Sequence, residues 1–211
     1  MSDLNVAELF DSIQGESTYT GMACFFVRLA GCNLNCTYCD TSASHEAGRP
    51  MAIEDIVAAC VASPAPLIEI TGGEPMQQQG FEALVTAIRA ACDKRVLVET
   101  NGTCDISRIP DGVVAVVDVK TPGSGMDGTF DESNVARLRP DDEVKFVLCD
   151  RRDYEWAAAF VRQHDLAAHC AAVLFSPSAH QLDAGRLAEW LVADGLPVRL
   201  QVQLHKLLNF K

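Results

Sequence analysis

The sequence has no apolar run long enough to cross a bilayer, and its N-terminus has no basic, apolar signal-peptide pattern. It also has no internal repeat, no low-complexity segment and no linker rich in Gly, Ser or Pro. We therefore expect one domain over residues 1–211 and no membrane partner. Nine cysteines without an export signal favour a reducing compartment, so we expect a cytoplasmic protein.

Basic residues are scarce: 17 Lys and Arg stand against 29 Asp and Glu, which gives a formal net charge of −12 at pH 7. A surface with this excess of negative charge repels phosphate backbones, so we expect no nucleic-acid partner. A local cationic pocket for a small anion is still compatible with this composition. Its candidate residues are Arg28, Lys120, Lys145, Arg199, Lys206 and Lys211.

Short apolar runs alternate with helical patterns along the chain. The runs predict strands over residues 25–29, 67–70, 96–99, 113–117, 144–148, 171–175 and 198–202. Helical spacing of apolar residues predicts helices over residues 53–61, 81–91, 152–163 and 184–193. This alternation favours a mostly parallel sheet with right-handed crossovers. Because the elements are too few for an eight-fold barrel, we expect an α/β fold with a partial, open barrel, reduced in helices.

Polar residues directly follow three of the predicted strands. Thr71-Gly72-Gly73-Glu74-Pro75, Glu99-Thr100-Asn101-Gly102 and Asp118-Val119-Lys120 each come after an apolar run. In barrel-like α/β folds, loops at the carboxyl ends of the strands converge on one mouth. The sequence therefore predicts the functional site at that end of the sheet.

Cys32, Cys36 and Cys39 form Cys-x3-Cys-x2-Cys directly after the first predicted strand. Three thiolates on one short loop can hold three irons of a cubane cluster and leave the fourth iron without a protein ligand. A zinc knuckle is an alternative, but zinc motifs usually supply four ligands in paired spacings. Chance clustering of core cysteines is another, since other cysteines are scattered through apolar runs. An open iron position would favour chemistry at the cluster.

The three-cysteine loop, with Tyr38 before its last cysteine, and the downstream Gly72-Gly73-Glu74-Pro75 segment resemble the radical S-adenosylmethionine (SAM) enzymes. The resemblance implies a 4Fe-4S cluster on the cysteines, with SAM bound to the fourth iron. It also implies that the Gly-Gly-Glu-Pro segment contacts the SAM amino group, since glycines let backbone carbonyls approach an ammonium. In isolation, the same segment would be interpreted as a turn.

A closer resemblance covers nearly the whole chain. The blocks at residues 10–16, 26–34, 39–41, 71–76, 99–102 and 203–206 are similar, in order and near spacing, to those of the 7-carboxy-7-deazaguanine synthase family. This implies a lyase that converts 6-carboxy-5,6,7,8-tetrahydropterin to 7-carboxy-7-deazaguanine with loss of ammonia, in queuosine and deazapurine biosynthesis. A deoxyadenosyl radical would abstract hydrogen from C6, and a Mg2+-assisted ring contraction would follow. The implied partners are an external flavodoxin-like or ferredoxin-like electron donor and a second copy in a homodimer.

The resemblance also implies roles for single residues, with the radical delivered by SAM and no catalytic side chain. Thr41 corresponds to a hydroxyl ligand of Mg2+, a cation that commonly takes one protein oxygen plus substrate and water. The implied SAM contacts are Tyr38, Gly72, Gly73, Glu74, Asp118, Val119, Lys120, Ser176, Pro177, Ser178 and Ala179. The implied substrate contacts are Ile13, Gln14, Gly15, Glu16, Arg28, Thr71, Glu99, Asn101, His205 and Lys211.

Plainer interpretations of some of these residues remain open. Arg28 could grip the substrate carboxylate or form a buried ion pair with a strand-end acid. Thr41 could end a turn, and His205 and Lys211 could lie in a solvated terminus. For the whole chain, the competing functions are an activase that places a glycyl radical on a partner protein, and a zinc- or cluster-holding binding module without activity.

Overall fold

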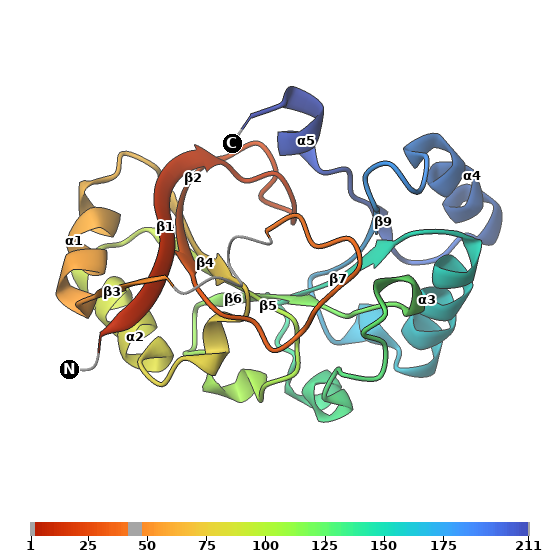
Figure 1. The fold of residues 1–211 in the computed structure, drawn as a ribbon. Coiled ribbons are helices and arrows are strands. Elements are labelled where there is room, and N and C mark those ends of the chain that lie inside the picture. Colours follow the sequence, from red (N-terminus) through yellow and green to blue (C-terminus); the bar gives the residue numbers. More distant parts are fainter. Residues whose placement is uncertain (1–2, 42–47, 211) are drawn as a thin grey trace.

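The computed structural model describes residues 3–41 and 48–210. Within them, nine strands form one sheet in the order β3-β1-β2-β4-β5-β6-β7-β8-β9, which curves around a central space (Figure 1). Their bounds are β1 Leu4–Ile13, β2 Ala23–Leu29, β3 Arg49–Met51, β4 Leu67–Gly72, β5 Arg95–Thr100, β6 Val114–Asp118, β7 Glu143–Leu148, β8 Ala172–Pro177 and β9 Arg199–Leu200.

From β2 through β9 every neighbouring pair of strands is parallel, whereas β1 is antiparallel to both β2 and β3. The order ends at β3 on one side and at β9 on the other, so the sheet does not close. The expected partial, open barrel is confirmed. No helix in the described part of the chain is long and apolar enough to span a membrane.

The four longer α-helices lie on the outside of the curved sheet, as Figure 1 shows. The α-helices are α1 Ile53–Ala62, α2 Phe81–Ala91, α3 Arg151–Gln163, α4 Ala184–Asp194 and α5 Leu204–Leu208. Short 3-10 helices are η2 Pro75–Gln77, η3 Ile106–Arg108, η4 Pro122–Ser124, η5 Glu132–Arg137 and η6 Leu166–Ala168. The crossovers from β5 to β6 and from β6 to β7 contain only such short turns, so the barrel is reduced in helices, as expected.

A buried asparagine replaces helix packing in these two crossovers. The Asn134 amide donates to the carbonyls of Gly102 (3.0 Å) and Cys104 (2.8 Å) and accepts from the Ile106 amide (3.1 Å). Both loops are thereby fixed to each other, because buried backbone groups outside regular elements need such partners. The carboxyl end of β5 is held in place without an α-helix behind it.

The period-two alternation of the strands divides the sheet into two faces. Outward residues such as Ile68, Ile70 and Val98 join the large core under the helices. Inward residues at the base of the barrel, including Leu67 and Leu97, form a smaller second core. The inward face therefore has an apolar layer around Leu67 and Leu97, while the inward positions nearer the carboxyl ends of β4 and β5, such as Thr71 and Glu99, are polar. These polar positions form the floor of the site.

The strands and helices of the α/β part lie where the sequence predicts them, with differences at both ends. The structure adds β1, β3 and α5, which the apolar pattern does not reveal. Strand β1 mixes buried and half-exposed residues, and β3 is only three residues long. The prediction of a strand over residues 198–202 is too long: β9 contains only Arg199–Leu200, because it is an exposed edge strand.

Candidate active site

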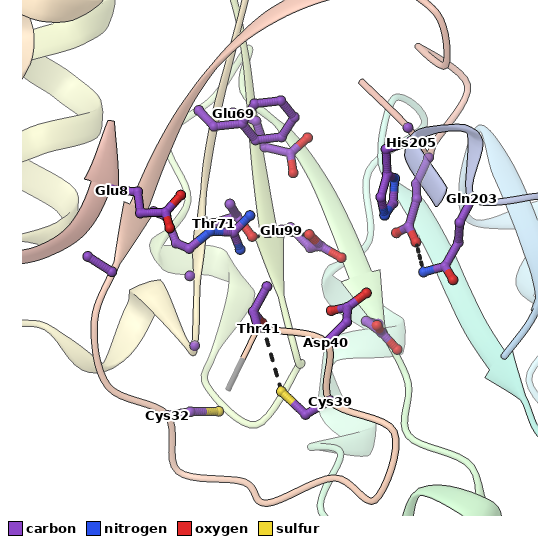
Figure 2. A pocket seen from close by; sticks show the side chains of 18 of the residues that line it. Glu8, Cys32, Cys39, Asp40, Thr41, Glu69, Thr71, Glu99, Gln203 and His205 are labelled. Carbon is purple, nitrogen blue, oxygen red and sulfur yellow. Dashed lines mark hydrogen bonds between the residues drawn. The ribbon is translucent and has the colours of Figure 1, made fainter. Parts of the chain in front are cut away.

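A cavity of about 810 Å³ opens at the carboxyl ends of the parallel strands (Figure 2). Its walls come from β1 and the turn after it, the cysteine loop, the ends of β4 to β7, and the segment around α5. Nineteen residues assigned from the sequence line it: Ile13, Gln14, Gly15, Glu16, Arg28, Cys32, Cys36, Tyr38, Cys39, Thr41, Thr71, Gly72, Gly73, Glu99, Asn101, Asp118, Lys120, Ser178 and His205.

The cysteine loop forms one wall of the cavity. The Cys39 amide donates to the Cys36 carbonyl (3.2 Å), and Thr37 attaches the loop to the β6–β7 crossover through the carbonyls of Ser124 (3.0 Å) and Gly123 (2.7 Å). In the ranges 3–41 and 48–210, no three His, Cys, Asp or Glu side chains are gathered closely enough to hold one metal ion. Each thiolate of a cubane binds a different iron, so three thiols on a shared wall suit a cluster.

Burial raises the pKa of the Cys32 and Cys36 thiols, and the nearby Lys120 ammonium opposes this rise. Lys120 forms an ion pair with Asp118 (3.0 Å) and lies over the Tyr38 ring, 5.8 Å from its centroid. Although burial disfavours its charge, the pKa of Lys120 is raised by Asp118. Because thiolates are the metal-binding form, loading the loop must release protons, and a fixed cation beside it helps to hold the resulting negative charge.

The end of β4 packs tightly against this loop. The Gly73 amide donates to the Leu29 carbonyl (3.2 Å), and the Glu74 amide donates to the Gly31 carbonyl (2.8 Å). A Cβ atom at Gly72 or Gly73 would overlap the backbone of the strand and loop beneath them. Only glycine permits this approach, which leaves the backbone of both residues open to the cavity.

Two buried polar atoms of residues that line the cavity, the Tyr38 hydroxyl and Asp118 Oδ1, have no hydrogen-bond partner within the described residues. Nearly all buried polar atoms in proteins are hydrogen-bonded, so such orphans indicate a missing ligand. The Asp118 carboxylate can accept from hydroxyl groups. Together with the three thiols and the glycine backbone, these atoms fit a cluster and SAM.

The opposite wall is built on the turn after β1. Gln14 Oε1 accepts from the Glu16 amide (3.0 Å), while the Gln14 side-chain amide donates to Glu69. The Gly15 carbonyl accepts from the Leu204 amide (2.9 Å), and a Cβ atom at Gly15 would overlap His205. The turn therefore connects the strand floor to the C-terminal segment.

Lys145 is the electrostatic centre of the cavity. Its ammonium contacts Glu16, Glu99 (2.5 Å) and Asp118 (3.3 Å), although its side chain is only 4% exposed. Despite burial, these acids raise the pKa of Lys145 well above its usual range. Although burial opposes it, Lys145 lowers the pKa of Glu99 to about 2. Thr71 Oγ1 also donates to Glu99 (3.1 Å), so a positioned, ionised carboxylate faces the cavity.

Arg28 lies beside the Phe10 ring, with its guanidinium carbon 5.7 Å from the ring centroid. No carboxylate in the described part of the chain lies within ion-pair distance of it. The structure thus offers no support for the buried ion pair that the sequence left open. An arginine lining a cavity among carboxylates is available for an anionic ligand group.

Thr41 lines the cavity at the end of the cysteine loop. Its Oγ1 lies 3.8 Å from Cys39 Sγ, as the dashed line in Figure 2 marks. The adjacent Asp40 forms an ion pair with Lys206 (2.7 Å). Although burial opposes it, Lys206 holds the pKa of Asp40 below its ordinary value. The C-terminal segment is thereby attached to the cysteine loop as well as to the turn after β1.

Several residues assigned from the sequence lie elsewhere. Glu74 is buried behind the cavity, where its carboxylate accepts from the Asn101 amide (2.7 Å), the Met76 amide (3.0 Å) and the Thr100 hydroxyl. Val119 belongs to the outer core. Ser176, Pro177 and Ala179 do not line the cavity, and Lys211 lies outside the described residues.

Glu69, Gln203 and Asp40 also line the cavity, although the sequence does not assign them to the site. Lys145 and Lys206, which the sequence offers only as candidates for a cationic pocket, line it too. Glu69 and Lys145 gave a detectable signal, because each is a charged residue inside an apolar strand run. Gln203 lies in the block over residues 203–206 that resembles the family, but only the folded chain brings its side chain to the Glu16 carboxylate (2.5 Å).

Comparison with known proteins agrees with this geometry. Residues 27–161 match the model of the Radical SAM superfamily. A 7-carboxy-7-deazaguanine synthase of Chlorobaculum tepidum is 42% identical over 208 residues, which cover 96% of this chain and 93% of that protein. One of Koribacter versatilis is 40% identical over 218 residues, covering 97% and 96%.

A crystal structure of QueE from Escherichia coli superposes with a TM-score of 0.77 at 23% identity and covers 96% of this chain and 95% of that one. That match supports the fold, whereas the sequence relatives identify the family. With the superfamily motif on one wall of the cavity and full-length relatives at this identity, the chain belongs to the 7-carboxy-7-deazaguanine synthase family of the Radical SAM superfamily.

Proposed function

We propose that this protein is a carbon-nitrogen lyase that converts 6-carboxy-5,6,7,8-tetrahydropterin to 7-carboxy-7-deazaguanine with loss of ammonia. The observation that supports this most directly is the shared cavity. It joins the three-cysteine loop on one wall to the Glu16–Lys145–Glu99 network on the other. A cluster on the cysteine loop would supply the radical, and the acid network on the other wall would accept hydrogen bonds from a ring rich in N–H donors.

Cys32, Cys36 and Cys39 would hold a 4Fe-4S cluster, and the backbone of Gly72 and Gly73 would face the amino group of SAM. The hydroxyl of Tyr38, the carboxylate of Asp118, Lys120 and Ser178 would surround the rest of SAM, where unpaired polar atoms are available. When bound, the cluster and SAM supply the radical that begins the reaction. An external one-electron donor is required for this step.

The protein's own residues would place and shield the pterin. The ionised Glu99 carboxylate accepts from ring N–H groups, and Glu16 does so from the neighbouring wall. Arg28 would pair with the substrate carboxylate, and the Thr41 hydroxyl would be one protein ligand for Mg2+, which would supply further positive charge to bind an anionic substrate group. Thr71 and Asn101, at neighbouring strand ends, border the same ring.

The C-terminal segment would limit the access of water to the radical. Its contacts reach both walls: Gln203 bonds Glu16, and Lys206 pairs with Asp40 after the last cysteine. His205 lies between them against Gly15. Excluding water from a reactive intermediate prevents side reactions, and a segment that spans both walls suits that role.

The deciding experiment is anaerobic reconstitution with iron and sulfide, followed by incubation with SAM, reductant, Mg2+ and 6-carboxytetrahydropterin. Mass analysis should detect 7-carboxy-7-deazaguanine, and Cys36→Ala should abolish cluster assembly and SAM cleavage together. A colourless protein with stoichiometric zinc would support the binding-module alternative. SAM cleavage that yields no pterin product, but places a radical on a partner protein, would support the activase.

Thr41→Ala should weaken the dependence of product formation on Mg2+ while the iron content of the protein stays unchanged. The physical reason is that a protein oxygen ligand of Mg2+ is lost. Titration of activity with Mg2+ in both proteins measures the effect. A Mg2+ dependence equal to that of the unmodified protein would contradict the ligand role.

A further inference from the structure

Glu69 is a carboxyl group in an otherwise apolar layer of the barrel. Its neighbours across the sheet are Phe26 on β2 and Leu97 on β5, and both belong to the inner hydrophobic core at the base of the barrel. Thr71, the next inward residue of β4, lies one layer nearer the opening. Glu69 is 4% exposed and lines the active-site cavity, so the little surface it has is turned toward the ligand.

The partner of Glu69 is an amide rather than a cation. The Gln14 side chain donates to Glu69 Oε2, and its own Oε1 is already committed to the Glu16 amide. Lys145 pairs with Glu16, Glu99 and Asp118, and no cation in the described part of the chain lies within ion-pair distance of Glu69. Of the acids around this cavity floor, Glu69 is therefore the one whose charge would be least compensated.

The surrounding charges act in the same direction. Burial, with Glu99 and Glu16 nearby, raises the pKa of Glu69 well above its ordinary value, against the opposing effect of Lys145. A carboxyl group that keeps its proton has one O–H donor as well as an acceptor. With Gln14 bonded to one oxygen, the other is left to face the cavity. Figure 2 shows Glu69 and Glu99 bordering the same space.

We propose that Glu69 is a further substrate-binding residue, which donates a hydrogen bond from its protonated carboxyl group to an acceptor atom of the substrate ring. The ligand atom is a ring carbonyl oxygen or an unprotonated ring nitrogen. This inference rests on the proposed function, because it concerns how the same cavity recognises the pterin ring by hydrogen bonds. Glu99 and Glu16 accept from ring N–H groups, and Glu69 supplies the complementary donor. The floor thus distinguishes a ring with both donors and acceptors from one with donors alone.

The test compares Glu69→Gln with Glu69→Leu in the reconstituted enzyme. Glutamine reproduces a protonated carboxyl group, since it offers a carbonyl to Gln14 and an N–H to the ligand. We expect kcat/KM within about threefold of the unmodified enzyme for Glu69→Gln. For Glu69→Leu we expect KM to rise about ten- to a hundredfold, because one hydrogen bond to the substrate is lost and its acceptor atom is left unpaired.

The pH profile separates the donor role from a structural one. If the protonated form binds substrate, kcat/KM should fall as pH rises through the pKa of Glu69, and this alkaline decline should be absent in Glu69→Gln. Glu143→Gln is the matched control. Glu143 is a buried inward carboxyl group whose pKa burial also raises, but it bonds Thr18 and does not line the cavity. It should leave both KM and the pH profile unchanged.

Two measurements test the protonation of Glu69 and the folding of the variants separately from activity. The infrared spectrum of the unmodified protein minus that of Glu69→Gln should contain the C=O band of a carboxylic acid, which belongs to protonated Glu69. Thermal unfolding and SAM binding establish that Glu69→Leu is folded. The proposal is overturned if Glu69→Gln loses as much kcat/KM as Glu69→Leu, if folded Glu69→Leu keeps its KM, or if the acid band is missing. Failure of the unmodified enzyme to form the product would instead refute the proposed function.

Discussion

Lys145 is the side chain on which the active-site electrostatics depends most. It reaches three acids on three different segments, namely Glu16, Glu99 and Asp118, from a position that water hardly reaches. Taking a charge out of water is costly, and the cost is met only when partners surround it. The Lys145 ammonium therefore fixes two acids on the proposed substrate side and one on the proposed SAM side.

Lys145→Met should destabilise the protein by about 3 kcal/mol, because the half-buried Glu16 and Glu99 lose the cation that they share, while Asp118 keeps only its ion pair with Lys120. Urea unfolding measures this change. Glu155→Gln removes the exposed Arg151–Glu155 pair (2.9 Å) and should cost less than about 1 kcal/mol. Equal stability of Lys145→Met and the unmodified protein would show that the acids are neutral or otherwise compensated.

The elements that surround the cavity differ in how firmly they are attached. Strands β4 to β7 belong to the parallel ladder and to the large core, whereas α5 is held by a few side-chain and backbone contacts to the turn after β1 and to the cysteine loop. Short helices with little buried apolar surface open at low energetic cost. Among the described elements that border the cavity, we therefore expect the α5 segment to open at the lowest energetic cost.

Gly15→Ala should displace α5, because the added methyl group would occupy the space of the His205 ring. We expect faster amide hydrogen exchange over residues 203–208 and a KM for the pterin raised by about tenfold, as one or two ordered contacts are lost. Leu207→Ala, at a side chain that is 70% exposed, is the control and should change neither property. An unchanged exchange rate in Gly15→Ala would mean that α5 is not held by this contact.

For the molecule as a whole, the paired acids determine how stability responds to pH. Glu99 has a pKa of about 2 in the folded protein, below its ordinary 4.5. Its contribution is fully present above pH 4.5 and is lost as pH falls toward about 2. Glu69 acts in the opposite direction, because a raised carboxyl pKa makes stability fall as pH rises through it.

Glu99→Gln should flatten the acid limb of the stability curve between about pH 4.5 and 2. The free energy of unfolding that Glu99 contributes over this pH range should be on the order of 2 kcal/mol. This figure already includes a reduction for solvent screening, because the Glu99 side chain is 27% exposed. Chemical denaturation at several pH values, compared with the unmodified protein, measures it. An acid limb of the same slope in both proteins would show that Glu99 is not the ionised partner of Lys145.

Local features of the sequence predict much of this architecture. The four longer α-helices and the strands from β4 to β8 coincide with apolar runs and helical spacing, because each pattern reflects a face that must be buried. The three-cysteine loop and the polar residues after strands place the site at the carboxyl ends of the strands. Strand β1 cannot be predicted in this way, because its apolar and polar residues do not alternate clearly and its burial is mixed.

The amino-acid sequence alone therefore determines three things. It identifies the cysteine loop, it determines through the spacing of apolar residues which segments are helices and which are strands, and it shows at which end of the sheet the site lies. The tertiary structure alone decides which charges meet. Lys145 and Glu16 are 129 residues apart, Gln203 and Glu16 are 187 apart, and Gln14 and Glu69 are 55 apart. The sign and strength of a charge interaction depend on distance and burial, and a linear pattern contains neither.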